Sequence, residues 1–295
     1  MTARSTTLTP LIVVCLAATW FVWGSTYLAI KFALDGFPPF FMMGTRFLVA
    51  GLVLAAWMRW RGAPWPSRRQ WAHALLIGAL LLGGGMGATA YAELTVSSGL
   101  VVAFIAVSPL MIAALNSLYG SHPSRLEWAG IGVGLVGTVL LTQGSGFAGA
   151  PLGLAAIAFA CATWCVGSVL SQRQFPLAPG AMGFASEMIA GALVLLLMSW
   201  LAGEQPNWQL ATIPAQAWWA WVYLVVAGSL IAFNAYMVLL EKASSGLASS
   251  YTYVNPVIAM LLGVWLANEV VAPLEWAAVG IILSGVVLLL IARKA

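Results

Sequence analysis

The chain has 295 residues, of which 62% are hydrophobic and only 7% are charged, and its formal net charge is +4. A water-soluble domain of this size needs far more polar surface, so the composition excludes a soluble globular protein and makes lipid the solvent for most of the chain. The basic residues are too few and too scattered to indicate nucleic-acid binding. We therefore expect an all-α integral membrane protein.

Ten apolar runs follow one another along the chain, separated by short stretches with Pro, Gly or charged residues. A spanning helix needs about 20 apolar residues to cross a hydrocarbon core of roughly 30 Å, and the runs have about that length. In the first half, transmembrane helices are predicted near residues 11–34, 38–60, 70–93, 97–119 and 126–144. In the second half, they are predicted near residues 150–172, 180–201, 217–240, 245–267 and 273–292.

The basic residues indicate how these helices cross the membrane. If the amino terminus is cytoplasmic, Lys31 faces outward and Arg46 lies within a helix. The other ten fall in inner loops and tails: Arg4, Arg59, Arg61, Arg68, Arg69, Arg125, Arg173, Lys242, Arg293 and Lys294. Cytoplasmic loops carry such an excess of Lys and Arg. We expect both termini in the cytoplasm and the chain in the cell inner membrane.

The two halves of the chain resemble each other. The tetrapeptide Ser97–Leu100 recurs 147 residues later as Ser244–Leu247, and the same offset relates Pro109 to Pro256. Ordered matches of this kind indicate a structural repeat rather than convergent membrane composition, which is the alternative. Because each repeat holds five helices, an odd number, the second must be inverted in the membrane. We predict one repeat over residues 1–145 and an inverted one over residues 146–295, an arrangement typical of secondary transporters.

Several motifs resemble the ten-helix EamA type of the drug/metabolite transporter superfamily, over the whole chain. They are the segment Thr19–Ser25, Arg46 in the second helix, the two prolines and Asn268-Glu269 at the end of the ninth helix. The resemblance implies a transporter of small organic solutes, and among relatives the chain looks most similar to amino-acid exporters, especially aromatic amino-acid exporters. The family often has Glu at the ends of both the fourth and ninth helices. Here His122 takes the place equivalent to Glu269.

Pro109 and Pro256 lie inside the fourth and ninth predicted helices. Proline removes a backbone donor and clashes with the carbonyl four residues earlier, so both helices should loosen there. Paired interruptions of this kind point to the binding region of a transporter, and here Ser108 and Asn255 are the adjacent polar side chains. A structural kink without a role in gating is the alternative.

Aromatic residues indicate the character of the binding region. Twelve of the fifteen tryptophans lie near predicted helix ends, as an interfacial belt requires, whereas Trp20, Trp23 and Trp164 lie mid-helix. Tyr27 shares a face with Trp20 and Trp23, which favours a cavity for an aromatic ligand, although helix packing explains these residues as well. The predicted substrate-binding residues are Trp20, Trp23, Tyr27, Arg46, Met86, Tyr91, Phe104, Ser108, Trp164, Ser168, Tyr251 and Asn255.

Glycines mark sites of close helix approach. Gly83, Gly84, Gly85 and Gly87 crowd the third helix, where they permit either tight packing or bending during gating. In the fifth helix, two glycines four residues apart (130 and 134) form a small-residue face that suits packing within the chain better than a dimer. A monomer is expected, and a dimer is left open.

Charges inside the membrane are costly and therefore indicate function. Arg46 could attract a substrate carboxylate or pair with an acidic side chain. Alternatively, it could form a structural hydrogen bond or extend its charged end toward the membrane surface. Glu187 is the only carboxylate well inside an apolar run, so we predict it as the proton site if export is proton-coupled; a structural carboxylate is the alternative. Glu93 and Glu241 lie at helix ends and are poorer candidates. Facilitated diffusion without ion coupling also fits.

The sequence lacks the motifs that an enzyme or a channel would need. No metalloprotease, hydrolase or P-loop motif is present, and no motif predicts a metal or cofactor, so an enzyme is not expected. A channel would need a charged ring or a filter-like loop. We predict an exporter that works by alternating access through a central cavity, with amino acids as substrates and aromatic ones preferred. A drug or metabolite exporter is the alternative, and a membrane enzyme a remote one. The expected partners are the small-molecule substrate and the lipid bilayer.

Overall fold

The computed structural model describes residues 9–120, 124–204, 212–243 and 250–292, and its regular elements are all helices. Eight helical spans are long and apolar enough to cross a membrane, and two shorter apolar helices follow them. The long spans are Pro10–Leu34, Pro39–Trp60, Arg68–Ala92, Ser98–Ser117, Arg125–Thr142, Pro151–Arg173, Ala181–Leu201 and Ala215–Leu239. The shorter helices are Val254–Leu266 and Pro273–Leu288.

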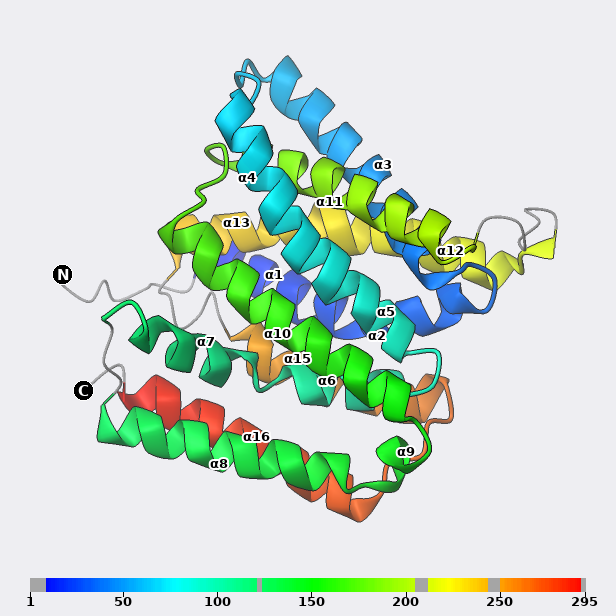
Figure 1. Cartoon of the computed structure of the whole chain (residues 1–295), viewed down its shortest axis with the longest axis vertical. Helices are drawn as coiled ribbons and strands as arrows, with labels where there is room; N and C mark the ends of the chain where they lie inside the picture. The colour runs from blue at the N-terminus through cyan, green and yellow to red at the C-terminus, as the bar shows by residue number, and fades with distance from the viewer. Residues whose placement is uncertain (1–8, 121–123, 205–211, 244–249, 293–295) are drawn as a thin grey trace.

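Figure 1 shows how the helices of the first half are arranged. The first span consists of α1, a π-helical turn and α2, and the third span is divided in the same way. In order, the elements are α1 (Pro10–Ala17), η1 (Ala18–Val22), α2 (Trp23–Leu34), α3 (Pro39–Trp60), α4 (Arg68–Gly78), η2 (Ala79–Gly87), α5 (Ala88–Ala92), α6 (Ser98–Ile105), α7 (Ser108–Ser117), α8 (Arg125–Thr142) and α9 (Ser145–Ala148).

The second half has one span that is divided by a π-helical segment, and its other helices are continuous over their described residues. Its elements are α10 (Pro151–Arg173), α11 (Ala181–Leu201), α12 (Ala215–Tyr223), η5 (Leu224–Ile231), α13 (Ala232–Lys242), α15 (Tyr251–Leu266) and α16 (Pro273–Ala292). Most predicted ranges agree with these bounds to within two residues. The predicted start of the ninth helix, the second copy of the repeated tetrapeptide and His122 lie outside the described residues.

Proline and acidic side chains account for where several helices begin. Pro10, Pro39 and Pro151 each occupy the first turn of a helix, where the missing N–H leaves no hydrogen bond unmade. Glu204, which follows α11, accepts hydrogen bonds from the N–H groups of Phe40 (3.2 Å) and Phe41 (2.8 Å) at the start of α3. The second half of the chain therefore caps a helix of the first half.

Two further carboxylates cap helices at the same end of the bundle. Glu269 follows α15 and accepts from the backbone N–H and the hydroxyl of Ser98 (both 2.8 Å) and from the N–H of Gly99 (3.1 Å), which begin α6. Glu275 accepts from the N–H of Gly146 (2.8 Å) in α9. These bonds tie the loops at that end to one another across the repeat.

Helices of one half pack mainly on helices of the other. The most extensive pairs are α8 with α16 and α3 with α11, and α2 packs on α15 while α10 packs on η2 and α5. Figure 1 shows α8 and α16 side by side along the lower edge. A Cβ on Gly285 of α16 would lie only 2.6 Å from the Gly130 carbonyl oxygen and 2.7 Å from the Gly134 nitrogen. The two predicted small residues of α8 therefore pack within the chain.

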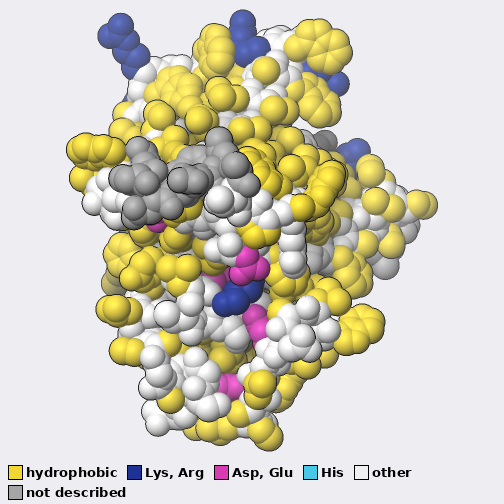
Figure 2. All heavy atoms as spheres, turned by 90° about the vertical axis from the view of Figure 1, so that its right-hand side faces the viewer, with side chains coloured by type: hydrophobic (Ala, Val, Ile, Leu, Met, Phe, Trp, Pro, Cys, Tyr) yellow, Lys and Arg dark blue, Asp and Glu magenta, His cyan; other side chains and the backbone are white. Residues whose placement is uncertain are grey.

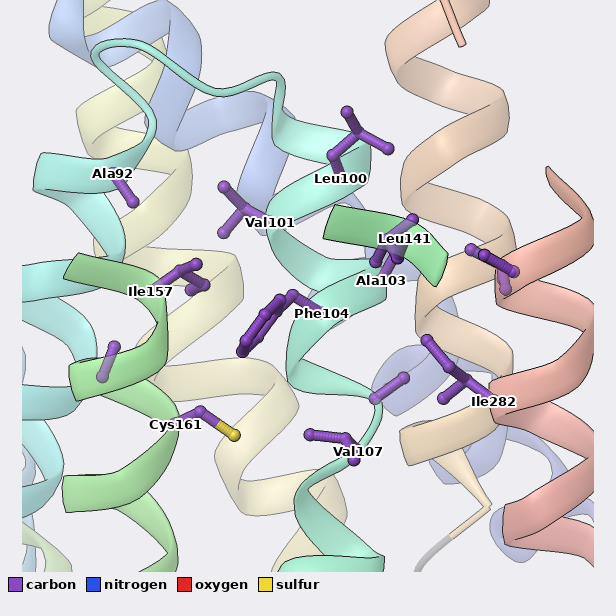
Figure 3. Packing of buried hydrophobic residues seen from close by; sticks show 14 of the residues in the cluster. Ala92, Leu100, Val101, Ala103, Phe104, Val107, Leu141, Ile157, Cys161 and Ile282 are labelled. Atoms are coloured by element: carbon purple, nitrogen blue, oxygen red, sulfur yellow. The ribbon is translucent and has the colours of Figure 1, made fainter. Parts of the chain in front are cut away.

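The four clustered glycines of the third span lie in the π-helical segment η2, and two of them meet α10 closely. A Cβ on Gly84 would lie 2.7 Å from the Thr163 hydroxyl, and one on Gly85 would lie 3.0 Å from the Trp164 ring. Figure 3 shows the adjoining core, in which Phe104 points from α6 toward Ile157 and Cys161 of α10. The close approach of η2, α6 and α10 creates the walls of the site described next.

Candidate substrate cavity

A cavity of about 630 Å³, counted with the space at its mouth, lies between α2, η2, the α6–α7 junction, α10 and α15. Eight of the residues predicted from sequence line it: Tyr27, Met86, Ser108, Pro109, Trp164, Tyr251, Asn255 and Pro256. Residues from both halves of the chain therefore meet at one cavity.

The fourth helix is interrupted at Pro109, beside this cavity. Helix α6 ends at Ile105 and α7 begins at Ser108, and Figure 3 shows the ribbon narrowing between them near Val107. Because Pro109 has no N–H, the Ile105 carbonyl cannot receive its usual helical bond, and the Ser108 hydroxyl donates to it instead (2.6 Å). The side chain before the proline thus replaces the lost donor.

The ninth helix behaves differently at Pro256, where the expected interruption is absent. Helix α15 runs through the proline without a gap. The Asn255 side-chain amide lies 3.0 Å from the Trp20 carbonyl and 3.2 Å from the Tyr251 carbonyl, and with its nitrogen toward them it donates to both. This side chain supports the first turn of α15 from within and ties it to the π-helical turn of the first span.

Trp20 and Trp23 are engaged by helices of the second half rather than exposed to the cavity. The Trp20 indole N–H donates to the Ser250 hydroxyl (2.7 Å), and that of Trp23 donates to the Gly228 carbonyl (3.1 Å). The Trp23 ring also packs edge-on against Tyr251 with centroids 4.8 Å apart. These contacts hold Tyr251, which does line the cavity, in place.

Arg46 is buried in α3 and does not line the cavity. Its Nε donates to the Ser229 hydroxyl (3.0 Å), one terminal nitrogen lies 3.7 Å from the Met43 sulfur, and the guanidinium lies over the Phe47 ring at 4.8 Å. With 4% of its surface exposed, the side chain does not snorkel. Of the alternatives predicted for Arg46, the structure shows the structural hydrogen bond. Recognition of a substrate carboxylate by Arg46 stays a prediction.

Four other predicted residues also lie away from the cavity wall. Tyr91 is partly exposed and stacks on Phe40 (6.1 Å between centroids), and the Ser168 hydroxyl donates to the Trp164 carbonyl within α10 (2.7 Å). Phe104 belongs to the buried core. Glu187 is buried in α11, so its predicted part in proton transfer has no direct contact with the cavity and stays a prediction.

Eight lining residues were not predicted from the sequence. They are Gly85, Thr89, Val102, Ile105, Ala106, Ala160, Cys161 and Thr252. Helical spacing held a signal for some of them, because Thr89 lies three residues after Met86 and Cys161 lies three before Trp164, on shared faces. Small apolar residues such as Ala106 and Ala160 give no sequence signal of this kind. Only the packing of the helices determines that they line the cavity.

The chemistry of the cavity wall is aromatic and uncharged. Tyr27, Trp164 and Tyr251 supply rings, while Thr89, Ser108 and Asn255 supply hydroxyl and amide groups, and the described lining includes no Lys, Arg, Asp or Glu. Such a wall can enclose an apolar or aromatic group and hydrogen-bond a few polar atoms, without the partners needed for covalent chemistry.

Apolar helices that close around an uncharged central cavity, with contacts exchanged between two halves, define a membrane transporter. The model of the EamA-like transporter family matches residues 9–143 and 151–291, and the chain belongs to this family. It is a multi-pass inner-membrane protein that carries a small-molecule substrate and is not an enzyme.

Individual relatives extend over nearly the whole chain. The inner membrane transporter YedA of Escherichia coli K12 is 40% identical over 280 residues, which cover 94% of this chain and 90% of YedA. The transporter sll0355 of Synechocystis sp. is 27% identical, over 93% of this chain and 88% of its own. A solved crystal structure matches with a TM-score of 0.66 at 25% identity, covering 96% of this chain and 98% of that one.

Proposed function

We propose that this transporter exports small organic solutes, first of all amino acids, with aromatic ones preferred. The observation that carries the proposal is the wall of the cavity, where Trp164 of α10 and Tyr27 and Tyr251 from α2 and α15 surround one space. Offset or edge-on contacts between rings contribute about 0.5 to 1.5 kcal/mol beyond simple burial. An indole or phenyl side chain therefore gains more in this cavity than an aliphatic one of similar size.

The polar groups of the cavity suit the backbone end of an amino acid. Ser108 and Asn255 lie beside Pro109 and Pro256, and Thr89 of α5 also lines the cavity. The Ser108 and Thr89 hydroxyls and the Asn255 amide nitrogen already donate to backbone carbonyls, so the oxygens of these side chains are left to accept hydrogen bonds. They therefore suit the ammonium group of an amino acid. Arg46, behind the wall, remains our candidate for attraction of the carboxylate.

For the mechanism, we propose alternating access by movement of an amino-terminal unit, residues 1–145, against an inverted carboxy-terminal unit, residues 146–295. The matched pairs α3–α11 and α8–α16 support a pseudo-symmetric arrangement, and the interrupted α6–α7 helix offers a place to bend at the cavity. We propose that Pro109 and Pro256 act in this gating.

The distribution of charge supports an orientation with both termini in the cytoplasm. The loops and helix ends at one end of the bundle carry Asp35, Glu93, Glu204, Glu269 and Glu275, and Lys31 is the one basic residue at this end among those that the structure describes. The connection between α3 and α4, which carries Arg59, Arg61, Arg68 and Arg69, lies at the opposite end of α3. By the excess of Lys and Arg in cytoplasmic loops, the acidic end faces outward.

Transport into proteoliposomes tests the substrate class. We expect saturable uptake of labelled tryptophan and phenylalanine, and a fall of about tenfold in the Trp164→Ala variant because its ring leaves the cavity. Trp200→Ala is the matched control, since that tryptophan is 63% exposed at the end of α11 and should change uptake by less than about twofold. If folded protein takes up no amino acid above empty liposomes, the amino-acid proposal fails.

The uncharged wall supports a second candidate, the export of neutral drugs or metabolites. A zwitterion must bury two charges in a cavity without a charged side chain among its described lining, whereas a neutral aromatic compound does not. Competition for tryptophan uptake by neutral indole separates the two. Inhibition by indole that is stronger than inhibition by tryptophan itself would favour the second candidate.

A further inference from the structure

Glu93, the residue directly after α5, is the one buried carboxylate at the acidic end without a hydrogen-bond partner among the described residues. It is 0% exposed, and neither carboxylate oxygen has a partner. Its neighbours Glu204, Glu269 and Glu275 each accept hydrogen bonds from backbone N–H groups. Helix capping therefore explains those three acids and leaves Glu93 unexplained.

The surroundings of Glu93 join the cavity to the acidic end. The Lys31 ammonium donates to the Glu93 backbone carbonyl (3.0 Å), and Lys31 lies one turn after the cavity residue Tyr27 on α2. The cavity residue Thr89 likewise lies one turn before Glu93 and accepts through its carbonyl from the Glu93 N–H (3.1 Å). Figure 2 looks onto this end and shows a basic side chain between acidic ones.

Charged and titratable groups reach this region from each neighbouring element. Helix α2 carries Tyr27 and Lys31, the loop after α15 carries Glu269, α3 carries Arg46, and α10 carries the thiols of Cys161 and Cys165. Burial raises the pKa of the Glu93 carboxyl well above its ordinary value, the Glu269 carboxylate raises it further, and the Lys31 ammonium lowers it.

An ionised carboxylate that is fully enclosed without hydrogen bonds is strongly disfavoured, so the enclosed side chain is neutral. A proton is the one cation that such a group can bind without any free space around it. We propose that Glu93 is a proton-binding site and that the outer end of the bundle closes only when the proton is bound. This inference rests on the proposed outward orientation and on transport as the function.

The proposed step is a simple acid dissociation. When the outer end opens and water reaches Glu93, its O–H bond breaks, both bonding electrons stay on the carboxylate, and the proton passes to water on the outer side. The carboxylate then lies beside the Lys31 ammonium, with which it can pair. Before the end closes again, the Glu93 carboxylate must take up a proton. Low outer pH therefore favours the closed state, and closure is lost as the pH rises through the carboxyl pKa of that state.

The test measures the distance between spin labels at two exposed positions of this end, Asp35 after α2 in the first unit and Val270 after α15 in the second, in lipid nanodiscs without substrate. The three native cysteines are replaced by alanine. We expect the distance to lengthen as pH rises in this background and to stay short at every pH with Glu93→Gln. A distance that ignores pH in the background, or that responds equally with Glu93→Gln, overturns the proposal.

Two further variants keep the test decisive if Glu93→Gln does not fold. Lys31→Gln should move the midpoint of the response to higher pH, because it removes the charge that favours ionised Glu93; an unchanged midpoint contradicts the proposal. Glu187→Gln tests the competing proton site: a response equal to that of the background supports Glu93, and loss of the response would assign the proton to Glu187 and overturn the proposal. Because the spin-label experiment contains no substrate, its outcome does not depend on whether amino-acid uptake is observed. A negative spin-label result likewise leaves the amino-acid proposal untouched.

Discussion

Small residues have opposite effects in the α8–α16 pair and in the cavity region. In α8 and α16, Gly130 and Gly134 meet Gly285 so closely that backbone touches backbone, and no space remains between the helices. Around the cavity, Gly85 brings η2 against the Trp164 ring, yet both residues line a space that has room for a ligand. Glycine permits close approach in both places, and the side chains beside it decide whether the space is filled.

The two regions also treat backbone hydrogen bonds differently. Helices α8 and α16 are uninterrupted over their described lengths, whereas the cavity is bordered by π-helical η2 and by the gap between α6 and α7. Irregular backbone inside a membrane is tolerated where it is buried in protein or lines a cavity. We infer that α8–α16 acts as a rigid support and that conformational change is concentrated around the cavity.

The largest effect is expected for Gly285→Ala, in the α8–α16 pair. The added methyl group would lie 2.6 Å from the Gly130 carbonyl oxygen, and backbone cannot move aside as a flexible side chain can. We expect a loss of about 3 kcal/mol in the free energy of unfolding, measured in mixed detergent micelles. Gly280→Ala on the same helix meets nothing within 4 Å and should change it by less than about 0.5 kcal/mol. Equal effects of the two would contradict close packing here.

A smaller effect is expected where the acidic end holds the cavity helix α6. Glu269→Gln keeps the shape of the side chain but sets an amide donor against one of the N–H groups that begin α6. We expect a loss of about 2 kcal/mol, since a charged cap and a hydrogen bond are both lost. Asp35→Asn, at an exposed site of the same end, serves as the control. A stability equal to that control would show that this cap does not hold α6.

The smallest effect concerns the repair of the interrupted helix. Ser108→Ala removes the donor to the Ile105 carbonyl, which the missing N–H of Pro109 cannot replace, so we expect a loss of about 1 kcal/mol. The exposed Ser284 makes a similar bond to the Gly280 carbonyl (2.7 Å), and Ser284→Ala should be nearly neutral. Unfolding curves recorded together for both variants check the difference. If the two curves coincide, the hydroxyl does not support the break.

Hydropathy, charge and helix-start signals were readable in the sequence because they are local properties. An apolar run of about 20 residues spans a membrane whatever its neighbours are, so each span could be predicted to within a few residues. The repeat also brought attention to Pro109 and Pro256, which do lie at the cavity. Trp164 was found as a mid-helix tryptophan, Tyr27 by its helical spacing from Trp23, and Tyr251 as the counterpart of Phe104 at the 147-residue offset.

Which face each helix turns inward was decided only by the tertiary structure. Trp20, Trp23 and Tyr27 share a stripe in the sequence, yet only Tyr27 lines the cavity, because helices of the second half engage the two tryptophans. Glu93 looked like an ordinary residue at a helix end until the packing of α2 and the loop after α15 enclosed it. Helix rotation and burial depend on partners far along the chain, and a local pattern does not contain them.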